Sequence, residues 1–323
     1  MSELVLSSLD EGVLTLTFNR PDRMNAWIEP MGRRYFDLLD EADRDPAVRV
    51  IVVTGAGRAF CAGADFQTLD AIQDGSYDEE PDKRPATHAT TVRKPVIAAV
   101  NGACAGLGMV HALVCDLVFT AEEAKWTTAF ARRGLIAEYG LAWLMPKLIG
   151  QAKAMDLLLS ARTFPGAEAA ALGLAVRALP AADLLRETLA YARELAVHSS
   201  PTSMSIIKRQ VWGDWQKTLD VSATEAAHLM RDSFARPDFA EGVASFVERR
   251  PRRSGPSPDG RARLGPHGRG RAGRHVMGTG FPHDEGDEHD RGHDEGGEDG
   301  DPEAAPRRGV GGRRFGAGGM RRT

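Results

Sequence analysis

The stretch from Lys94 to Asp116, KPVIAAVNGACAGLGMVHALVCD, constrains the fold more than any other part of the chain. It opens with a short apolar run after Pro95, which is typical of a strand covered on both faces, and Asn101-Gly102 ends that run. Gly106 and Gly108 follow, and their lack of a Cβ permits positive φ and lets a ligand come close to the backbone. The pattern predicts a buried strand, a tight glycine turn and the start of a helix.

Such a turn places free backbone N–H groups beside a helix N-terminus, where anions bind. Several interpretations are open at this point. The turn could be an ordinary tight turn, or it could bind a nucleotide phosphate. Met109 and Val110, however, stand where a dinucleotide-binding loop needs its third glycine. Any other anion site depends on what the rest of the chain brings to this turn.

Composition divides the 323-residue chain into a long folded part and a tail. Up to about Pro251 the chain fits one domain of roughly 250 residues, which is long enough for an enzyme. Residues 254–323 consist mainly of Gly, Arg, Asp, Glu, His and Pro and cannot bury a core. We therefore expect a core over residues 1–200, a helical C-terminal region over 201–253 and a disordered Gly/Arg/Asp-rich tail over 254–323.

Charge and cysteine content exclude several classes of protein. The formal net charge is −4, and acidic and basic residues are mixed through the folded part, so we expect no nucleic-acid partner. Cys61, Cys104 and Cys115 lack metal-ligand spacing and an even count, which predicts reduced thiols in a cytoplasmic protein without a metal site. The N-terminus lacks a secretion signal, and no apolar stretch reaches about 20 residues, so we expect no membrane partner.

Hydrophobic periodicity predicts an α/β protein in which strands and helices come first and helices alone come last. The expected strands are 4–9 and 13–18, paired as a hairpin around Gly12, then 48–54, 96–100, 117–120 and 174–178. The expected helices are 29–43, 141–149, 152–160, 167–172 and 183–197, followed by a mostly helical region from Pro201 to Arg250. Residues 75–91 are polar and predict a mobile loop or a loosely held helix with few core contacts, and residues 124–140 are expected to be irregular.

Three segments in this order resemble the crotonase superfamily, the enoyl-CoA hydratase and isomerase family: RAFCAGADF at 58–66, KPVIAAVNGACAGLG at 94–108 and CDLVFTAEEAKW at 115–126. NRPDRMNAW at 19–27 and EGVASFVERR at 241–250 extend the likeness over about residues 3–253. The resemblance implies a crotonase-like spiral of ββα units with a helical C-terminal region. It also implies association into a homotrimer or a dimer of trimers, with the helical region 201–253 as the trimerisation region. Acyl-CoA would be the substrate, so coenzyme A would arrive with the thioester and no cofactor would be bound permanently.

By position, the resemblance assigns the backbone N–H groups of Ala64 and Leu107 to an oxyanion hole for the thioester oxygen. Chemistry beside a thioester builds negative charge on that oxygen, and two fixed N–H donors, one at a helix N-terminus, stabilise the charge. The alternative is that Gly63 and Gly106, which precede these residues, serve only as turn residues.

The likeness also implies which residues hold coenzyme A. They lie in two loops and a terminal helix: Arg23, Met24, Ala26, Ala62, Ala64, Asp65, Phe66, Phe246 and Arg249. Asp65 has a simpler role open to it, which is to cap the helix that follows. Gln67 stands where the family often has a lysine, so a phosphate contact there is in doubt.

The chain departs from the family at the residues that move protons. A typical hydratase of the family holds one water between two glutamates, and Val110 and Phe130 occupy those positions here. Neither side chain can transfer a proton. Two-carboxylate hydration therefore loses an acid and a base that each contribute about 10²–10⁴-fold.

Glu138, in the segment GLIAEYGLAW, is the remaining candidate acid or base. Its apolar neighbours should raise the pKa of its carboxyl, which suits proton transfer. Its position resembles that of the base of dienoyl-CoA isomerases and of the nucleophilic aspartate of chlorobenzoyl-CoA dehalogenases. A surface or helix-capping glutamate is the alternative.

Other side chains have less specific expectations. His88 lies about where dehalogenase-type enzymes keep a histidine, or it is an exposed loop histidine, and His111 is a packing residue or a hydrogen-bond donor behind the site. The acyl pocket is expected to be lined by Phe66, Val110, Trp126, Phe130, Tyr139 and Trp143, although aromatics near a core are often only core.

The expected function is an acyl-CoA enzyme in which Glu138 shuttles a proton and isomerises a double bond through an enolate. Three alternatives stay open. They are a 2-enoyl-CoA hydratase of fatty acid β-oxidation, a hydrolytic enzyme with Glu138 as nucleophile, and a non-catalytic acyl-CoA binder.

Overall fold

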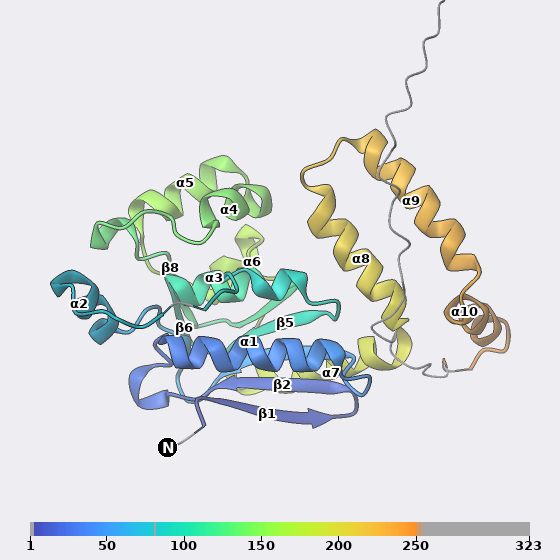
Figure 1. The fold of residues 1–323 in the computed structure, drawn as a ribbon, viewed down its shortest axis with the longest axis horizontal. Helices are drawn as coiled ribbons and strands as arrows, with labels where there is room; N and C mark the ends of the chain where they lie inside the picture. Colours follow the sequence, from blue (N-terminus) through green and yellow to red (C-terminus); the bar gives the residue numbers. More distant parts are fainter. Residues whose placement is uncertain (1–2, 81, 251, 253–323) are drawn as a thin grey trace, which may run out of the picture. The chain divides into compact units, whose positions relative to one another are not determined.

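The computed structural model describes residues 3–80, 82–250 and 252 (Figure 1). Two sheets form its centre. The larger has the strand order β1-β2-β3-β5-β7-β10 and the smaller the order β4-β6-β8-β9. The expected disordered tail over 254–323 lies outside the described residues.

The larger sheet begins with an antiparallel hairpin and continues with parallel strands. Its members are β1 (Val5–Asp10), β2 (Val13–Phe18), β3 (Val50–Gly55), β5 (Val96–Val100), β7 (Leu117–Ala121) and β10 (Arg177–Leu179). Every residue of β3 and β5 is buried, as their continuous apolar runs predict for central parallel strands. β10 begins later than expected, because Leu174 and Ala175 pack in the core before the strand starts.

The smaller sheet consists of short strands, and its first three each follow a strand of the larger sheet. They are β4 (Ala59–Cys61), β6 (Ala103–Ala105), β8 (Lys125–Thr127) and β9 (Phe164–Pro165). β8 lies in a segment that was expected to be irregular, and pairing with β6 holds it in place. In β3-β4-α2 and again in β5-β6-α3, a strand of the larger sheet is followed by a strand of the smaller sheet and then by a helix. The expected spiral of ββα units is therefore confirmed.

Helices cover both sheets. In chain order they are α1 (Glu29–Arg44), α2 (Phe66–Asp74), α3 (Leu107–Leu113), α4 (Leu141–Ile149), α5 (Gln151–Ser160), α6 (Gly166–Leu172), α7 (Ala181–His198), α8 (Pro201–Asp214), α9 (Leu219–Phe234) and α10 (Pro237–Val247). α7 packs on β2, β3, β5 and β7, whereas α3 contacts strands of both sheets. The short helix α3, which follows the glycine turn, is therefore held on both sides.

A buried ion pair docks α8 on the core. The Nζ atom of Lys208 lies 2.7 Å from Oδ2 of Asp116 and also donates to the carbonyl oxygens of Ala89 and Lys94. The other carboxylate oxygen of Asp116 accepts from the indole N–H of Trp212 at 2.8 Å. Because both ions are nearly covered, losing one partner would leave a desolvated charge, so this contact orients α8.

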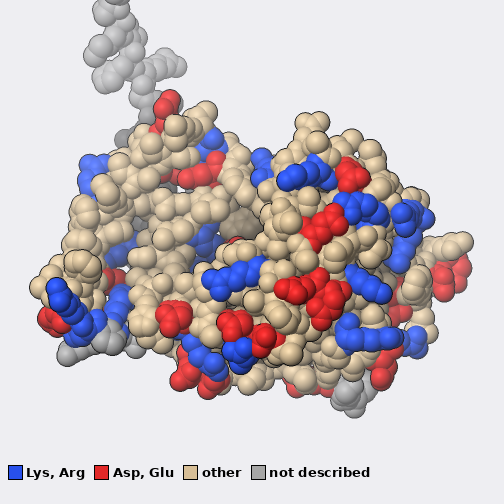
Figure 2. All heavy atoms as spheres, turned by 180° about the vertical axis from the view of Figure 1, so that it is seen from behind, with Lys and Arg blue, Asp and Glu red and all other residues tan. Residues whose placement is uncertain are grey.

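Residues 75–91 are tied more firmly than a mobile loop would be. Arg84 pairs with Asp37 and Asp40 on the outer face of α1, and Nε2 of His88 lies 2.8 Å from Oδ1 of Asp40. The carboxylates recur at three-residue spacing along α1, so one helix face presents them together. His88 thus belongs to an ion-pair cluster. Elsewhere charges of both signs lie interspersed among uncharged residues, as on the face in Figure 2.

His111 on α3 is buried in an aromatic cluster with Phe18, Trp27, Tyr35 and Phe36. Its ring stacks on that of Trp27 with centroids 3.9 Å apart. Neither ring nitrogen hydrogen bonds to a described residue. Burial therefore lowers the pKa of His111 from 6.5 to about 3, and the ring is neutral in the folded protein.

A neutral buried histidine makes folding sensitive to acid. Below its ordinary pKa of 6.5 the unfolded chain takes up a proton that the folded chain refuses down to about pH 3, so stability is lost as the pH falls through this window. We expect His111 to account for about 2 kcal/mol of lost unfolding free energy between pH 7 and pH 5.

The measurement is urea unfolding across that range for the native protein and His111→Leu. The variant should lose less stability on acidification, whereas His228→Asn, at an exposed position, should follow the native protein. Equal pH dependence in all three would refute the buried neutral histidine.

Candidate active site

A cavity of about 270 Å³ opens where the glycine turn meets the loop after β4. Its wall comes from four parts of the chain: the start of α1, the 63–64 loop with α2, the 106–107 turn and the segment 129–139. Ala64, Leu107, Phe130, Glu138 and Tyr139, which were singled out in the sequence, all line it. Residues far apart in the sequence are thus brought to one site.

Direct packing joins the two glycine motifs. β4 runs parallel to β6, and Cys61 lies opposite Cys104 in the register of the two strands. A Cβ at Gly108 would overlap the carbonyl oxygen of Cys61, so only glycine lets α3 approach the loop this closely. Gly63 has φ +97°, and a Cβ on it would lie 3.0 Å from the carbonyl oxygen of Ala105. Each motif therefore shapes the other.

The backbone N–H groups of Ala64 and Leu107 are free within the described part of the chain. Neither donates a hydrogen bond to another described residue, although the neighbouring N–H groups of Asp65 and Gly106 do. Leu107 is the first residue of α3, where backbone N–H groups have no partner inside the helix. Two donors without acceptors therefore belong to residues that line the same cavity.

Replacement by alanine should change the stability of the protein in opposite directions at Gly108, which is tightly packed, and at Gly213, which is not. Gly108→Ala should lower the free energy of unfolding by roughly 1–3 kcal/mol, because the new methyl group overlaps a backbone carbonyl. Gly213→Ala, on α8 with open space around it, should raise that free energy by roughly 0.5–1 kcal/mol. Chemical denaturation compares them, and a Gly108→Ala protein as stable as the native one would contradict this packing.

Glu138 lies half-buried in the cavity wall, just before α4. Burial raises the pKa of its carboxyl above the ordinary 4.5. Glu138 does not cap α4, which was the alternative expectation. Gly140 is the N-cap of α4, and no side chain caps the helix. The carboxylate also makes no hydrogen bond to a described residue.

The expected pocket aromatics divide into wall and core. Phe130 and Tyr139 line the cavity, whereas Val110 is fully buried in α3 behind it. The expectation that Trp126 lines the pocket is wrong. Trp126 is buried in the core, where it stacks with Phe164 and donates from Nε1 to Thr120 Oγ1 at 3.0 Å. β8 turns its side chain into the hydrophobic core, away from the cavity.

Trp143 and Phe66 lie outside the cavity lining as well. Trp143 packs against Trp215, with ring centroids 5.1 Å apart, and against the ammonium group of Lys147. Phe66 is 67% exposed at the start of α2, with the guanidinium of Arg133 over its ring. Since Arg133 does line the cavity, Phe66 stands beside its rim.

The two loops expected to hold coenzyme A run side by side. Ala62 donates its N–H to the carbonyl of Met24, and Trp27 and Ala64 form a parallel bridge. Arg23 and Ala26 flank these contacts in the first loop. Asp65 caps α2 by accepting from the N–H of Gln67 at 3.0 Å, and it pairs with Arg20, so the simpler expectation for Asp65 is confirmed.

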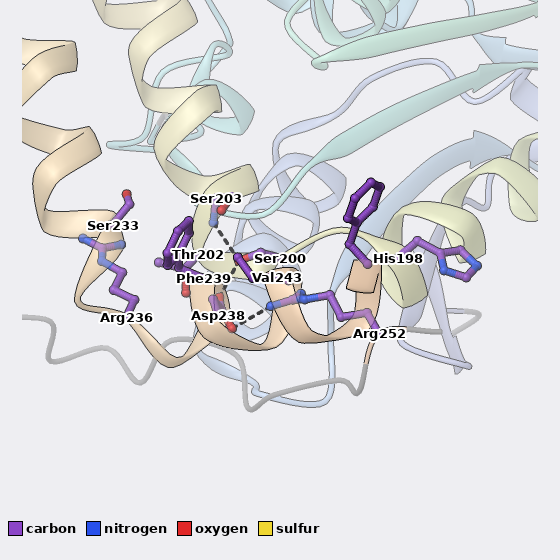
Figure 3. A pocket seen from close by; sticks show the side chains of 12 residues that line it. His198, Ser200, Thr202, Ser203, Ser233, Arg236, Asp238, Phe239, Val243 and Arg252 are labelled. Carbon is purple, nitrogen blue, oxygen red and sulfur yellow. Dashed lines mark hydrogen bonds and ion pairs between the residues drawn. The ribbon is translucent and has the colours of Figure 1, made fainter. Parts of the chain in front are cut away.

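Phe246 and Arg249 do not belong to this cavity. Phe246 lines a separate, open cavity of about 550 Å³ between α8 and α10, and Arg249 follows α10 outside both linings. Figure 3 shows the polar end of that second cavity, where Asp238 joins Ser200 to Arg252. Within this chain, the terminal helix does not reach the cavity that holds Glu138.

Three further residues of the wall carry no local sequence signal for a site. Glu29, Tyr77 and Arg133 line the cavity, yet Glu29 looked like a helix start and Tyr77 a loop residue. In the described part of the chain, no cluster of His, Cys, Asp and Glu could hold a metal ion. None of its helices is long and apolar enough to span a bilayer.

Comparisons with known proteins agree with this architecture. A family model described as enoyl-CoA hydratase/isomerase matches residues 8–254. The 1,2-epoxyphenylacetyl-CoA isomerase of Escherichia coli K12 is 34% identical over 257 residues, covering 77% of this chain and 97% of that protein.

Two solved structures are similar in fold and sequence. A probable enoyl-CoA hydratase/isomerase from Mycobacterium abscessus has a TM-score of 0.72 and 32% identity, covering 78% of this chain and 98% of its own. An enoyl-CoA hydratase from Mycobacterium marinum has a TM-score of 0.58 and 45% identity, covering 67% and 100%. With its two-sheet spiral, paired glycine motifs and matched length, the chain belongs to the enoyl-CoA hydratase/isomerase family of the crotonase superfamily.

Proposed function

We propose that the protein isomerises a carbon–carbon double bond in an acyl-CoA thioester, with Glu138 as its proton-transfer group. One observation carries the proposal: the carboxyl of Glu138 and the unpaired N–H groups of Ala64 and Leu107 line the same cavity. The N–H groups suit a thioester oxygen that becomes negative, and the carboxylate suits the proton that must leave a neighbouring carbon.

The reaction runs in two proton transfers. The carboxylate of Glu138 takes a proton from one carbon of the acyl chain, and the electrons of that C–H bond move through the conjugated system to the thioester oxygen. The N–H groups of Ala64 and Leu107 stabilise the resulting enolate. Glu138, now protonated, returns the proton to a different carbon. The double bond has moved, and the carboxylate is regenerated.

The loops at Arg23–Ala26 and Ala62–Phe66 would hold the coenzyme A part through main-chain groups, since they already run side by side. The isomerase named among the relatives supports a reaction of this kind on a CoA thioester. Coenzyme A thus enters and leaves with the substrate.

Glu138→Gln should lower kcat by about 10²–10⁴-fold, because the amide cannot accept or return the proton. Since the pKa of Glu138 is raised, the native rate should fall on acidification through a pKa above 4.5, and the variant should lose this dependence. Glu123→Gln, at an exposed position between β7 and β8, is the matched control and should keep native kinetics. Native activity in Glu138→Gln would remove this residue from the mechanism.

Hydration is the second candidate, because solved relatives carry the name enoyl-CoA hydratase. Crotonyl-CoA in isotopically labelled water separates the reactions. Label at the α or γ carbon without added water supports isomerisation, whereas addition of water across the double bond supports hydration. Release of free acid would instead support Glu138 as a nucleophile, and binding without any reaction a non-catalytic role.

We also propose a homotrimer, or a dimer of trimers, held by the C-terminal helices. α9 and α10 leave large apolar side chains in solvent, among them Leu219 (82% exposed) and Phe246 (85%). Exposed apolar surface of this kind marks an interaction site. A neighbouring copy would cover Phe246, which its own chain leaves open.

Sedimentation equilibrium tests this assembly. The native protein should have three or six times the mass of one chain. Phe246→Glu should shift it towards the monomer, because a charge in an apolar interface is costly. Leu9→Glu, on the exposed face of β1, should leave the mass unchanged. A monomeric native protein would end the proposal.

A further inference from the structure

Two tyrosine hydroxyl groups line the active-site cavity without hydrogen-bond partners among the described residues. Tyr139 follows Glu138 directly, and Tyr77 comes from the segment after α2, where its backbone N–H donates to Ala71 at 3.0 Å. The wall combines apolar side chains such as Leu69 and Ile72 with the charged groups of Glu29, Arg133 and Glu138. The two phenols add uncharged hydroxyl groups to this mixed wall.

The backbone turns Tyr139 towards the cavity in an unusual way. Tyr139 has φ +51°, a left-handed conformation that bulky side chains rarely adopt, and Gly140 follows with φ +84°. Successive side chains in an extended segment point to opposite sides, whereas Glu138 and Tyr139 line one cavity. Backbone strain of this kind is common where function requires a particular placement of side chains.

Both phenols remain protonated at neutral pH. Burial raises the pKa of Tyr139, and the charges of Glu138 and Glu29 raise it further. Burial also raises the pKa of Tyr77, followed by the charges of Glu29 and Glu79. Because the carboxylates oppose a phenolate, these hydroxyl groups serve as hydrogen-bond donors and do not give up their protons.

We propose that Tyr77 and Tyr139 bind an oxygen atom of the acyl group, outside the thioester, so that the site selects oxygen-bearing acyl groups over plain hydrocarbon chains. A hydrocarbon that filled the cavity would cover both hydroxyl groups and leave them unpaired, which opposes binding. An oxygen acceptor on the substrate would pair with them instead. This inference rests on the proposed function, because it assumes a CoA thioester in this cavity.

Binding of unreactive, saturated thioesters tests the selection without relying on turnover. Isothermal titration calorimetry would compare hexanoyl-CoA with hexanoyl-CoA thioesters that carry one hydroxyl group at each position from the third carbon outward. We expect at least one hydroxylated thioester to bind the native protein roughly tenfold more tightly than hexanoyl-CoA.

Tyr139→Phe and Tyr77→Phe should each remove most of this preference, because they weaken binding of the hydroxylated thioester and no longer leave a hydroxyl group unpaired against hexanoyl-CoA. Binding of hexanoyl-CoA at least as tight as in the native protein also establishes that the variants are folded. Tyr191→Phe, whose ring packs on Phe119 on the larger sheet, is the matched control and should keep the preference.

The possible failures are distinguishable. If no CoA thioester binds the native protein, the proposed function falls, and this inference falls with it. If hexanoyl-CoA binds as tightly as every hydroxylated thioester, or if the preference survives in both Tyr139→Phe and Tyr77→Phe, only the selection by the two phenols is overturned.

Discussion

The site depends on a contact between a glycine and a carbonyl group. Gly108 lets α3 lie directly against Cys61, and pairing of β4 with β6 holds that contact in register. Any larger residue would push α3 away from the loop that contains Ala64. Because α3 also packs on strands of both sheets, the core fixes its position. Packed backbone thus fixes the turn that contains Leu107, as the proposed stabilisation of a thioester oxygen requires.

Around this backbone, the cavity wall combines apolar side chains with polar ones, and burial raises the pKa of three of the polar groups. Glu138 has a raised pKa, and the phenols of Tyr77 and Tyr139 are kept protonated. Glu29 and Glu138 bring acidic groups into the wall from two different elements. The proposed isomerisation uses Glu138 from this wall together with the backbone N–H groups of Ala64 and Leu107.

The C-terminal helices are joined to the core through a small set of polar contacts. Lys208 and Asp116 dock α8, whereas α9 and α10 keep large apolar side chains in solvent. Isolated chains rarely expose so much apolar surface without a partner to cover it. Phe246, in the terminal segment that the family resemblance connects with coenzyme A, lies away from the cavity of its own chain.

Much of this could be predicted from residue pattern alone. Continuous apolar runs located β3 and β5, and the glycine motifs located Ala64 and Leu107, because backbone geometry leaves a local signature. Side-chain direction has no such signature. Trp126 was expected in the pocket and lies in the core, while Glu29 and Tyr77 line a cavity that no local pattern connects them to. The sequence by itself determined the strands, the glycine turns and the family. Only the tertiary structure decided which side chains share the cavity, because that depends on how distant segments pack.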